Sequence, residues 1–132
     1  MSDVAIIPES HRDLVDTPHT ASLSTVGADG MPQVTAFWVL REGDVLKTSL
    51  QKSRQKYKNI AANPRATVFL IDPTNPMRTL EVRGDVTTDE DPDAVFFDRM
   101  VRHYGMDPAT FPAPRDNRVV VTFTPRRVSV LG

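Results

Sequence analysis

Short segments in which apolar and polar residues alternate recur along the chain, and this period of two is typical of β-strands with one buried face. The alternation is regular over residues 79–87, where Leu80 and Val82 share one face and Glu81 and Arg83 share the other. Residues 66–71 are apolar on both faces, as is typical of a central strand. The same pattern predicts five further strands, at residues 19–26, 33–40, 45–50, 119–123 and 128–131.

Turn-forming residues separate these strands. Residues 27–30 and 41–44 contain glycines, which adopt positive φ without steric cost, so both segments are predicted to be hairpin turns. In the strand between the two turns, alternation places four apolar residues on one face: Val34, Ala36, Trp38 and Leu40.

Three helices are predicted between the strands. The first covers residues 9–15. The second follows Ser53, a residue type that often caps a helix N-terminus, and the Asn-Pro pair at residues 63–64 ends it. The third has Asp91 as its cap and Pro92 at its first helical position.

Seven or so short strands joined mostly as hairpins, with helices only at the crossovers, are typical of an antiparallel barrel. The fold class expected is therefore mainly β (α+β). A length of 132 residues suits one domain, and neither a linker nor an internal repeat divides the sequence, so we expect a single domain over residues 1–132.

Composition excludes several classes of protein. The chain has no cysteine, so disulfides, thiolate metal sites and thiol nucleophiles are excluded. The formal net charge of −1 disfavours a protein that coats nucleic acid through bulk charge. No apolar segment approaches the ~20 residues that span a bilayer, and the first sixteen residues do not resemble a signal peptide. We therefore expect a soluble cytoplasmic protein without a membrane partner.

The charges are segregated along the chain. Between Asp44 and Asp72 there is no acidic residue, although the segment contains six cations: Lys47, Lys52, Arg54, Lys56, Lys58 and Arg65. Residues 85–98 are the reverse, with six carboxylates and no Lys or Arg. Several of the cations fall at the start of the second predicted helix, where the helix dipole favours negative charge. A phosphate bound there by backbone N–H groups and cationic side chains would explain them.

Two other interpretations of this basic segment stay open. The segment is also typical of a solvated helix face whose positive charge is balanced by the acidic segment. A nucleic-acid surface is less favoured, because bases stack on aromatic side chains and Tyr57, the one aromatic residue among these cations, suits the core better.

Three parts of the sequence resemble the pyridoxamine 5′-phosphate oxidase-like split-barrel flavoproteins. Residues 48–60 combine a serine at a strand end with an Arg-x-Lys-x-x-Asn helix start, and an Asn-Pro turn follows at 63–64. The hairpin of Ala-Ser-Leu-Ser-Thr-Val (21–26) and Gly-x-Pro-Gln-Val (30–34) resembles the first two strands of that superfamily, and residues 117–128 resemble its last pair. The resemblance covers nearly the whole chain and implies an antiparallel split β-barrel.

Within this superfamily the short chain most resembles the actinobacterial flavin/deazaflavin oxidoreductases that use coenzyme F420. The resemblance implies four ligands of the cofactor's phosphate: Ser49, Arg54, Lys56 and Asn59. It also implies a strand segment along the deazaflavin ring, consisting of Gln33, Val34, Thr35 and Ala36. Lys52 and Lys58 are assigned, by charge alone, to the oligoglutamate tail that F420 carries and FMN lacks.

The function implied is that of an F420H2-dependent reductase, which transfers a hydride from the reduced cofactor to an electron-poor small molecule. This chemistry needs no side chain as a nucleophile, in agreement with the absence of cysteine and of a G-x-S-x-G motif, and the proton donor stays open between solvent and a nearby acid. Two alternatives stay open: an FMN-dependent enzyme on the same barrel, like the pyridoxamine phosphate oxidases, and a non-catalytic flavin- or deazaflavin-binding protein.

The remaining candidate residues have simpler interpretations. His11, His19 and His103 lie far apart and lack i, i+4 spacing, so no metal site is predicted. Trp38 is expected either to form a wall of the cofactor site or to lie in the core or a dimer interface. The third helix presents a stripe that is interpreted as packing: Phe97, Val101 and Tyr104.

A homodimer is expected, because the superfamily's sites lie between subunits and a small split barrel exposes an apolar sheet face. Phe37, Trp38 and Val39 are consecutive and cannot all point into one core, so at least one of them is expected to contact a partner. The aromatic residue that the superfamily's partner subunit often contributes to the ring is not found, since Pro76-Met77-Arg78 occupies that region.

Overall fold

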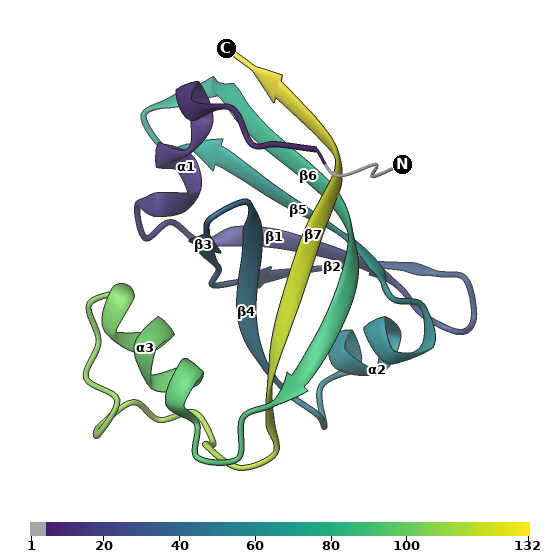
Figure 1. Ribbon diagram of the computed structural model, residues 1–132, viewed down its shortest axis with the longest axis vertical. Helices are drawn as coiled ribbons and strands as arrows, with labels where there is room; N and C mark the ends of the chain where they lie inside the picture. The colour runs from purple at the N-terminus through teal and green to yellow at the C-terminus, as the bar shows by residue number, and fades with distance from the viewer. Residues whose placement is uncertain (1–4) are drawn as a thin grey trace.

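The alternating segments form seven antiparallel strands, which pair in the order β2-β1-β5-β6-β7-β4-β3 in a computed structural model that describes residues 5–132 (Figure 1). The strands are β1 (Ala21–Val26), β2 (Pro32–Phe37), β3 (Leu40–Glu42), β4 (Val45–Gln51), β5 (Arg65–Asp72), β6 (Asn75–Glu90) and β7 (Arg118–Leu131). The helices are a 3-10 turn, η1 (Glu9–His11), and α1 (Asp13–Asp16), α2 (Gln55–Ala62) and α3 (Val95–His103). The predicted mainly β fold with short crossover helices is confirmed. Residues 1–4 lie outside the described residues. They belong to the predicted domain and to the N-terminal segment that does not resemble a signal peptide.

The two C-terminal strands predicted from the sequence are one strand, β7. Pro125 interrupts the alternation there, but it pairs with Gly84 of β6 at a bulge in the β6–β7 ladder. A Cβ at position 84 would lie 2.5 Å from the carbonyl oxygen of Thr124, so only glycine permits this approach. A bulge tolerates a proline, which has no N–H to donate, and the strand therefore continues past it.

The predicted strand at residues 33–40 is instead divided into β2 and β3. Its four apolar residues predicted to share one face have different environments, because the β1–β2 pairing ends at Phe37. Val34 and Ala36 are exposed, Trp38 is half-buried, and Leu40 is buried.

The interior has two hydrophobic clusters rather than one. The main cluster fills the barrel and contains both Phe37 and Val39. The second cluster lies beneath α3, and Trp38 packs against it, stacked on Tyr104 with ring centroids 4.5 Å apart. The chain's own second cluster thus accommodates Trp38, so residues 37–39 by themselves do not require a partner, and the expected partner contact stays a prediction.

Strand β5 pairs with β1 on one side and with β6 on the other, as a central strand should. Its two faces nevertheless differ. Ala66, Val68 and Leu70 are buried, whereas Phe69 is half-buried and Ile71 is exposed. The predicted central position is therefore confirmed, although within the described residues the face with Phe69 and Ile71 is not fully covered.

The helix starts differ from those predicted. Helix α2 has Arg54 as its N-cap, and the Ser53 hydroxyl instead donates to Oε1 of Gln51. Helix α3 begins at Val95, so Pro92 precedes the helix rather than occupying its first position. Asp91 still serves as a cap, because its buried carboxylate accepts hydrogen bonds from the first backbone N–H groups of α3 (residues 95–97) at 3.0, 3.4 and 3.1 Å.

The helices of this structure are short, and within residues 5–132 none is long and apolar enough to span a membrane.

We expect Asp91→Ala to lower the free energy of unfolding by about 1–2 kcal/mol, because three N–H groups at the start of α3 lose their acceptor. Urea denaturation followed by circular dichroism measures this change. Asp93→Ala is the matched control, since within the described residues the Asp93 carboxylate accepts no hydrogen bond. An equal decrease in the free energy of unfolding of Asp91→Ala and Asp93→Ala would contradict the capping role.

Candidate functional site

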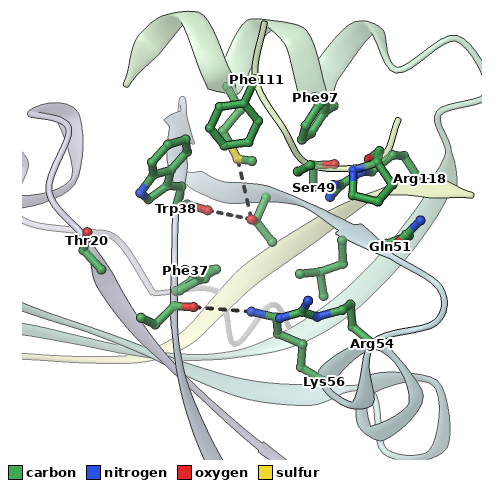
Figure 2. A pocket seen from close by; sticks show the side chains of 16 residues that line it. Thr20, Phe37, Trp38, Ser49, Gln51, Arg54, Lys56, Phe97, Phe111 and Arg118 are labelled. Carbon is green, nitrogen blue, oxygen red and sulfur yellow. Dashed lines mark hydrogen bonds between the residues drawn. The ribbon is translucent and has the colours of Figure 1, made fainter. Parts of the chain in front are cut away.

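A cavity of about 450 Å³ lies where the barrel is open (Figure 2). β3 pairs with β4 only over Val45–Lys47, so within residues 5–132 the rest of β4 has a strand on one side only, β7. The cavity occupies the space between this free edge of β4 and the end of β2. Its walls come from β2, β4, the start of α2, α3, the loop after α3 and the first residue of β7: Thr20, Ala36, Phe37, Trp38, Thr48, Ser49, Leu50, Gln51, Arg54, Lys56, Phe97, Met100, Phe111, Ala113, Pro114 and Arg118.

Side chains bridge the opening in two places. The Thr48 hydroxyl donates a hydrogen bond of 2.6 Å to the carbonyl oxygen of Trp38. The Lys56 ammonium donates one of 3.3 Å to the carbonyl oxygen of Ala36. These two contacts hold the end of β2 at a fixed separation from β4 and α2.

In the part of the chain that the structure describes, three cations and no carboxylate line the cavity: Arg54, Lys56 and Arg118. Burial lowers the pKa of Lys56, and the nearby charges of Arg54 and Arg118 lower it further. Burial and Arg54 also lower the pKa of Arg118, against the opposing effect of Asp116 and Asp91. The cavity therefore concentrates positive charge that only an anion would offset.

Ser49 adds a polar group without a partner. The residue is only 5% exposed, and its hydroxyl makes no hydrogen bond within the described residues. A buried hydroxyl left unpaired costs roughly 1–3 kcal/mol. Because Ser49 lines the cavity beside cations, an oxygen atom of an anionic ligand is the natural acceptor for its proton.

Asn59, predicted as a phosphate ligand, is buried outside the cavity lining. Its amide donates to the hydroxyl of Thr25 and to Oε1 of Gln33, both at 3.0 Å, and accepts from Nε2 of Gln55 at 2.8 Å. A Cβ at Gly27 would lie 2.5 Å from Oδ1 of Asn59, so the turn after β1 packs closely on this amide. Asn59 thus fastens α2 to the β1–β2 hairpin.

Of the four residues predicted to lie along the ring, only Ala36 lines the cavity. Gln33 belongs to the Asn59 network, and the Thr35 hydroxyl is buried without a partner in the described residues. Val34 is 68% exposed on the outer face of the sheet. The structure therefore brings together Ala36, Ser49, Arg54 and Lys56 from the predicted set.

The two lysines assigned to an acidic tail lie outside the lining as well. Nζ of Lys52 is 2.5 Å from Oε1 of Glu90, and this hydrogen bond raises the pKa of Lys52. Arg65 similarly lies 3.8 Å from Asp85. The acidic segment thus balances Lys52 and Arg65, as the solvated-face interpretation predicts for them, whereas Lys58 is exposed on α2.

One wall of the cavity consists of Trp38, Phe97, Met100 and Phe111 together with Gln51 and Arg118, and of these only Trp38 was a candidate from the sequence. Phe97 was interpreted as packing only, and Trp38 was left open. Nothing in the sequence distinguishes Arg118 from the other arginines. Its position becomes evident only from the β4–β7 register, which pairs it with Gln51.

The sequence matches the family model for pyridoxamine 5′-phosphate oxidase over residues 7–132. The pyridoxine/pyridoxamine 5′-phosphate oxidase of Bradyrhizobium sp. (strain ORS 278) is 36% identical over 96 residues. The match covers 69% of this chain and 43% of that protein, so the chain spans less than half the length of the curated relative.

Solved structures agree with the family match. One named F420 reductase has a TM-score of 0.87 at 39% identity, and the match covers 93% of this chain and 98% of that chain. A conserved hypothetical protein from Mycobacterium tuberculosis has a TM-score of 0.76 at 23% identity, over 99% of this chain and 88% of that chain, and shows the shared fold. The predicted split-barrel fold and its family resemblance are confirmed.

We expect inorganic phosphate to raise the pKa of Lys56, because a bound anion offsets the burial and the cationic neighbours that lower it. Phosphate affinity should correspondingly fall as pH rises through the lowered pKa, where Lys56 loses its charge. In Arg54→Ala the pKa should move part of the way back toward its ordinary value, since burial remains. NMR titration of the lysine ε-methylene signals measures both effects, and an unchanged pKa in Arg54→Ala would contradict the coupling.

Proposed function

Because the chain belongs to the pyridoxamine 5′-phosphate oxidase family, we propose that it is an oxidoreductase that binds coenzyme F420 and reduces an electron-poor small molecule. The observation that carries this proposal is the cavity, whose lining combines two cations at the start of α2, Arg54 and Lys56, with the aromatic side chains Trp38 and Phe111. The similarity to the structure named F420 reductase supports the choice of cofactor, because it extends over almost the whole of both chains.

The residues present fit such a cofactor. Arg54 and Lys56 stand at the start of α2, where helix N–H groups and the dipole also favour a phosphate. Ala36 lies at the mouth of the cavity, and the aromatic side chains Trp38 and Phe111 offer apolar surface to a planar ring system. When bound, the reduced cofactor supplies the hydride.

The chain's own residues orient and shield the reacting groups. Arg54 and Lys56 would hold the phosphate by charge-assisted hydrogen bonds and so would anchor the cofactor at the start of α2. The half-buried Trp38 and the buried Phe97 and Met100 exclude water from the cavity. Among residues 5–132 the lining contains neither a carboxylic acid nor a histidine, and we propose that water delivers the proton.

Titration of the purified protein with F420 and with FMN tests the cofactor assignment. Trp38 is the only tryptophan of the chain and lines the cavity, so its fluorescence reports occupancy directly. We expect F420 to quench this fluorescence and to bind more tightly than FMN, and F420H2 to be oxidised in the presence of an electron-poor acceptor. Tighter FMN binding would favour the FMN-dependent alternative, and F420 binding without turnover of any acceptor would favour a non-catalytic binding protein.

We expect Arg54→Ala and Lys56→Ala each to weaken F420 binding about ten- to hundredfold, because each removes a charge-assisted contact worth ~1.5–3 kcal/mol. Stability should change little, since Arg54 is exposed and Lys56 is only half-buried. Arg127→Ala is the control, because Arg127 is exposed on β7 and lies outside the lining. Unchanged F420 affinity in both cavity variants would contradict the phosphate assignment.

We also propose that the chain forms a homodimer through the open face of β2, β1 and β5. Val34 is 68% exposed and Ile71 49% exposed there, beside small residues of β1 such as Ser22 and Ser24. Ala36 belongs both to this face and to the cavity lining, so a second copy on the face would lie at the cavity mouth.

Sedimentation velocity tests the dimer. We expect the wild-type protein to sediment as a dimer at micromolar concentration, and Val34→Asp to shift it toward monomer by placing a charge in the apolar contact. Lys58→Asp, which changes an exposed residue of α2, is the control. A wild-type protein that sediments as a monomer would contradict the proposal.

A further inference from the structure

We propose that Arg118 and Ser49 form an oxyanion subsite, separate from Arg54 and Lys56, for the carboxylate of a planar, apolar substrate. This inference rests on the proposed function, because it names the substrate class of the same cavity. Three features support it: the contacts that fix the Arg118 guanidinium, the unpaired Ser49 hydroxyl next to it, and the apolar side chains around both groups.

The Arg118 guanidinium is fixed in place before any ligand binds. It lies over the ring of Phe97, 4.0 Å from the ring centroid, and its Nε donates a hydrogen bond of 2.8 Å to the carbonyl oxygen of Pro114. The two terminal nitrogens make no hydrogen bond within residues 5–132. A guanidinium fixed at Nε, with both terminal nitrogens available, has the fork geometry that binds a carboxylate through two parallel hydrogen bonds.

Ser49 stands beside this fork. The antiparallel register pairs Gln51 with Arg118 and Ser49 with Val120, so all four side chains project from the same side of the sheet. The Gln51 amide is already engaged with Asp116, donating to its carbonyl oxygen at 3.2 Å and to Oδ1 at 3.3 Å. The buried Ser49 hydroxyl therefore remains as the unpaired donor next to Arg118.

The surroundings select an apolar, planar body for the ligand. Phe111 lies between Trp38 and Phe97, with ring centroids 5.5 and 6.0 Å from theirs, and Met100 completes this wall. Burial lowers the pKa of Arg118, so a carboxylate held there would interact in a poorly hydrated environment, where charge-assisted hydrogen bonds are strong. Within the described residues no carboxylate lies within ion-pair distance of Arg118, which leaves its charge for a ligand.

The subsite is distinct from the proposed phosphate site. Figure 2 shows Arg118, Ser49 and Phe97 on the side of the cavity toward α3, whereas Arg54 and Lys56 lie on the side toward α2. The proposal therefore assigns the two sets of cations to two different anionic groups.

Binding of 2-naphthoate, measured through Trp38 fluorescence, tests the proposal against its neutral isostere 2-naphthamide. We expect the amide to bind about tenfold more weakly or worse, because it cannot accept both hydrogen bonds as an anion. Arg118→Lys keeps the charge but loses the fork and should weaken naphthoate about tenfold, and Arg118→Met should weaken it further. Ser49→Ala should weaken naphthoate binding a few-fold. Arg127→Met, on the same strand as Arg118 but outside the cavity, should leave naphthoate affinity unchanged.

Repeating the titration in saturating F420 by isothermal titration calorimetry, because F420 is expected to quench Trp38, separates this proposal from the proposed function. We expect naphthoate to bind in the presence of F420 and Arg118→Met to leave F420 affinity unchanged. Competition between the two ligands, with equal loss of both affinities in Arg118→Met, would place Arg118 in the phosphate site and overturn the subsite. Loss of F420 affinity alone in Ser49→Ala would likewise overturn the pairing of Ser49 with Arg118. Naphthoate binding that depends on Arg118 in a protein without affinity for F420 would support the subsite and overturn the cofactor assignment.

Discussion

Where β2 meets β4 the sheet is joined by side chains instead of a backbone ladder. The Thr48 hydroxyl donates to the Trp38 carbonyl oxygen and Lys56 to that of Ala36, and the cavity opens between these two contacts. A closed ladder would leave no room there, and a fully open edge would expose backbone groups and invite pairing with other chains. The opening also explains why residues 37–39 can serve two clusters: Phe37 and Val39 point into the barrel, while Trp38 turns toward α3 and forms part of the cavity wall.

Partial burial of the cationic side chains in the cavity costs free energy, and other contacts of the same side chains offset part of it. Half-burying Lys56 and Arg118 near Arg54 disfavours their charged forms, as the lowered pKa values of Lys56 and Arg118 indicate. Arg118 regains part of this energy from the Phe97 ring and the Pro114 carbonyl oxygen, and Lys56 from the Ala36 carbonyl oxygen. None of these partners is an anion, so the positive charge itself remains available. Lys52 and Arg65 show the contrasting arrangement, in which a carboxylate of the same chain lies next to the cation at the surface.

The sequence predicted the antiparallel barrel because alternation over two residues is a local property of each strand. It predicted Arg54 and Lys56 because both belong to one short motif at a helix start. It did not predict Arg118, since the position of that residue depends on a strand register between segments that are far apart in the sequence. Asn59 belongs to the same motif as Arg54, yet its amide faces the β1–β2 hairpin. A motif fixes spacing along a helix, but the packing of that helix decides which of its residues face the cavity.

The two sides of the cavity depend on different parts of the fold. The side with Arg54 and Lys56 is positioned by α2, which Asn59 fastens to Thr25 and Gln33. The side with Phe97 and Met100 is positioned by α3, whose first turn is held by Asp91 and whose end is fixed by Tyr104, which bonds to the backbone of Val39 and His19. These hydrogen bonds share no residue, so substitutions in α3 and its following loop can reshape the aromatic wall while the cations at α2 keep their positions. Such a division allows one anion-binding arrangement to be combined with different substrate walls on the same barrel.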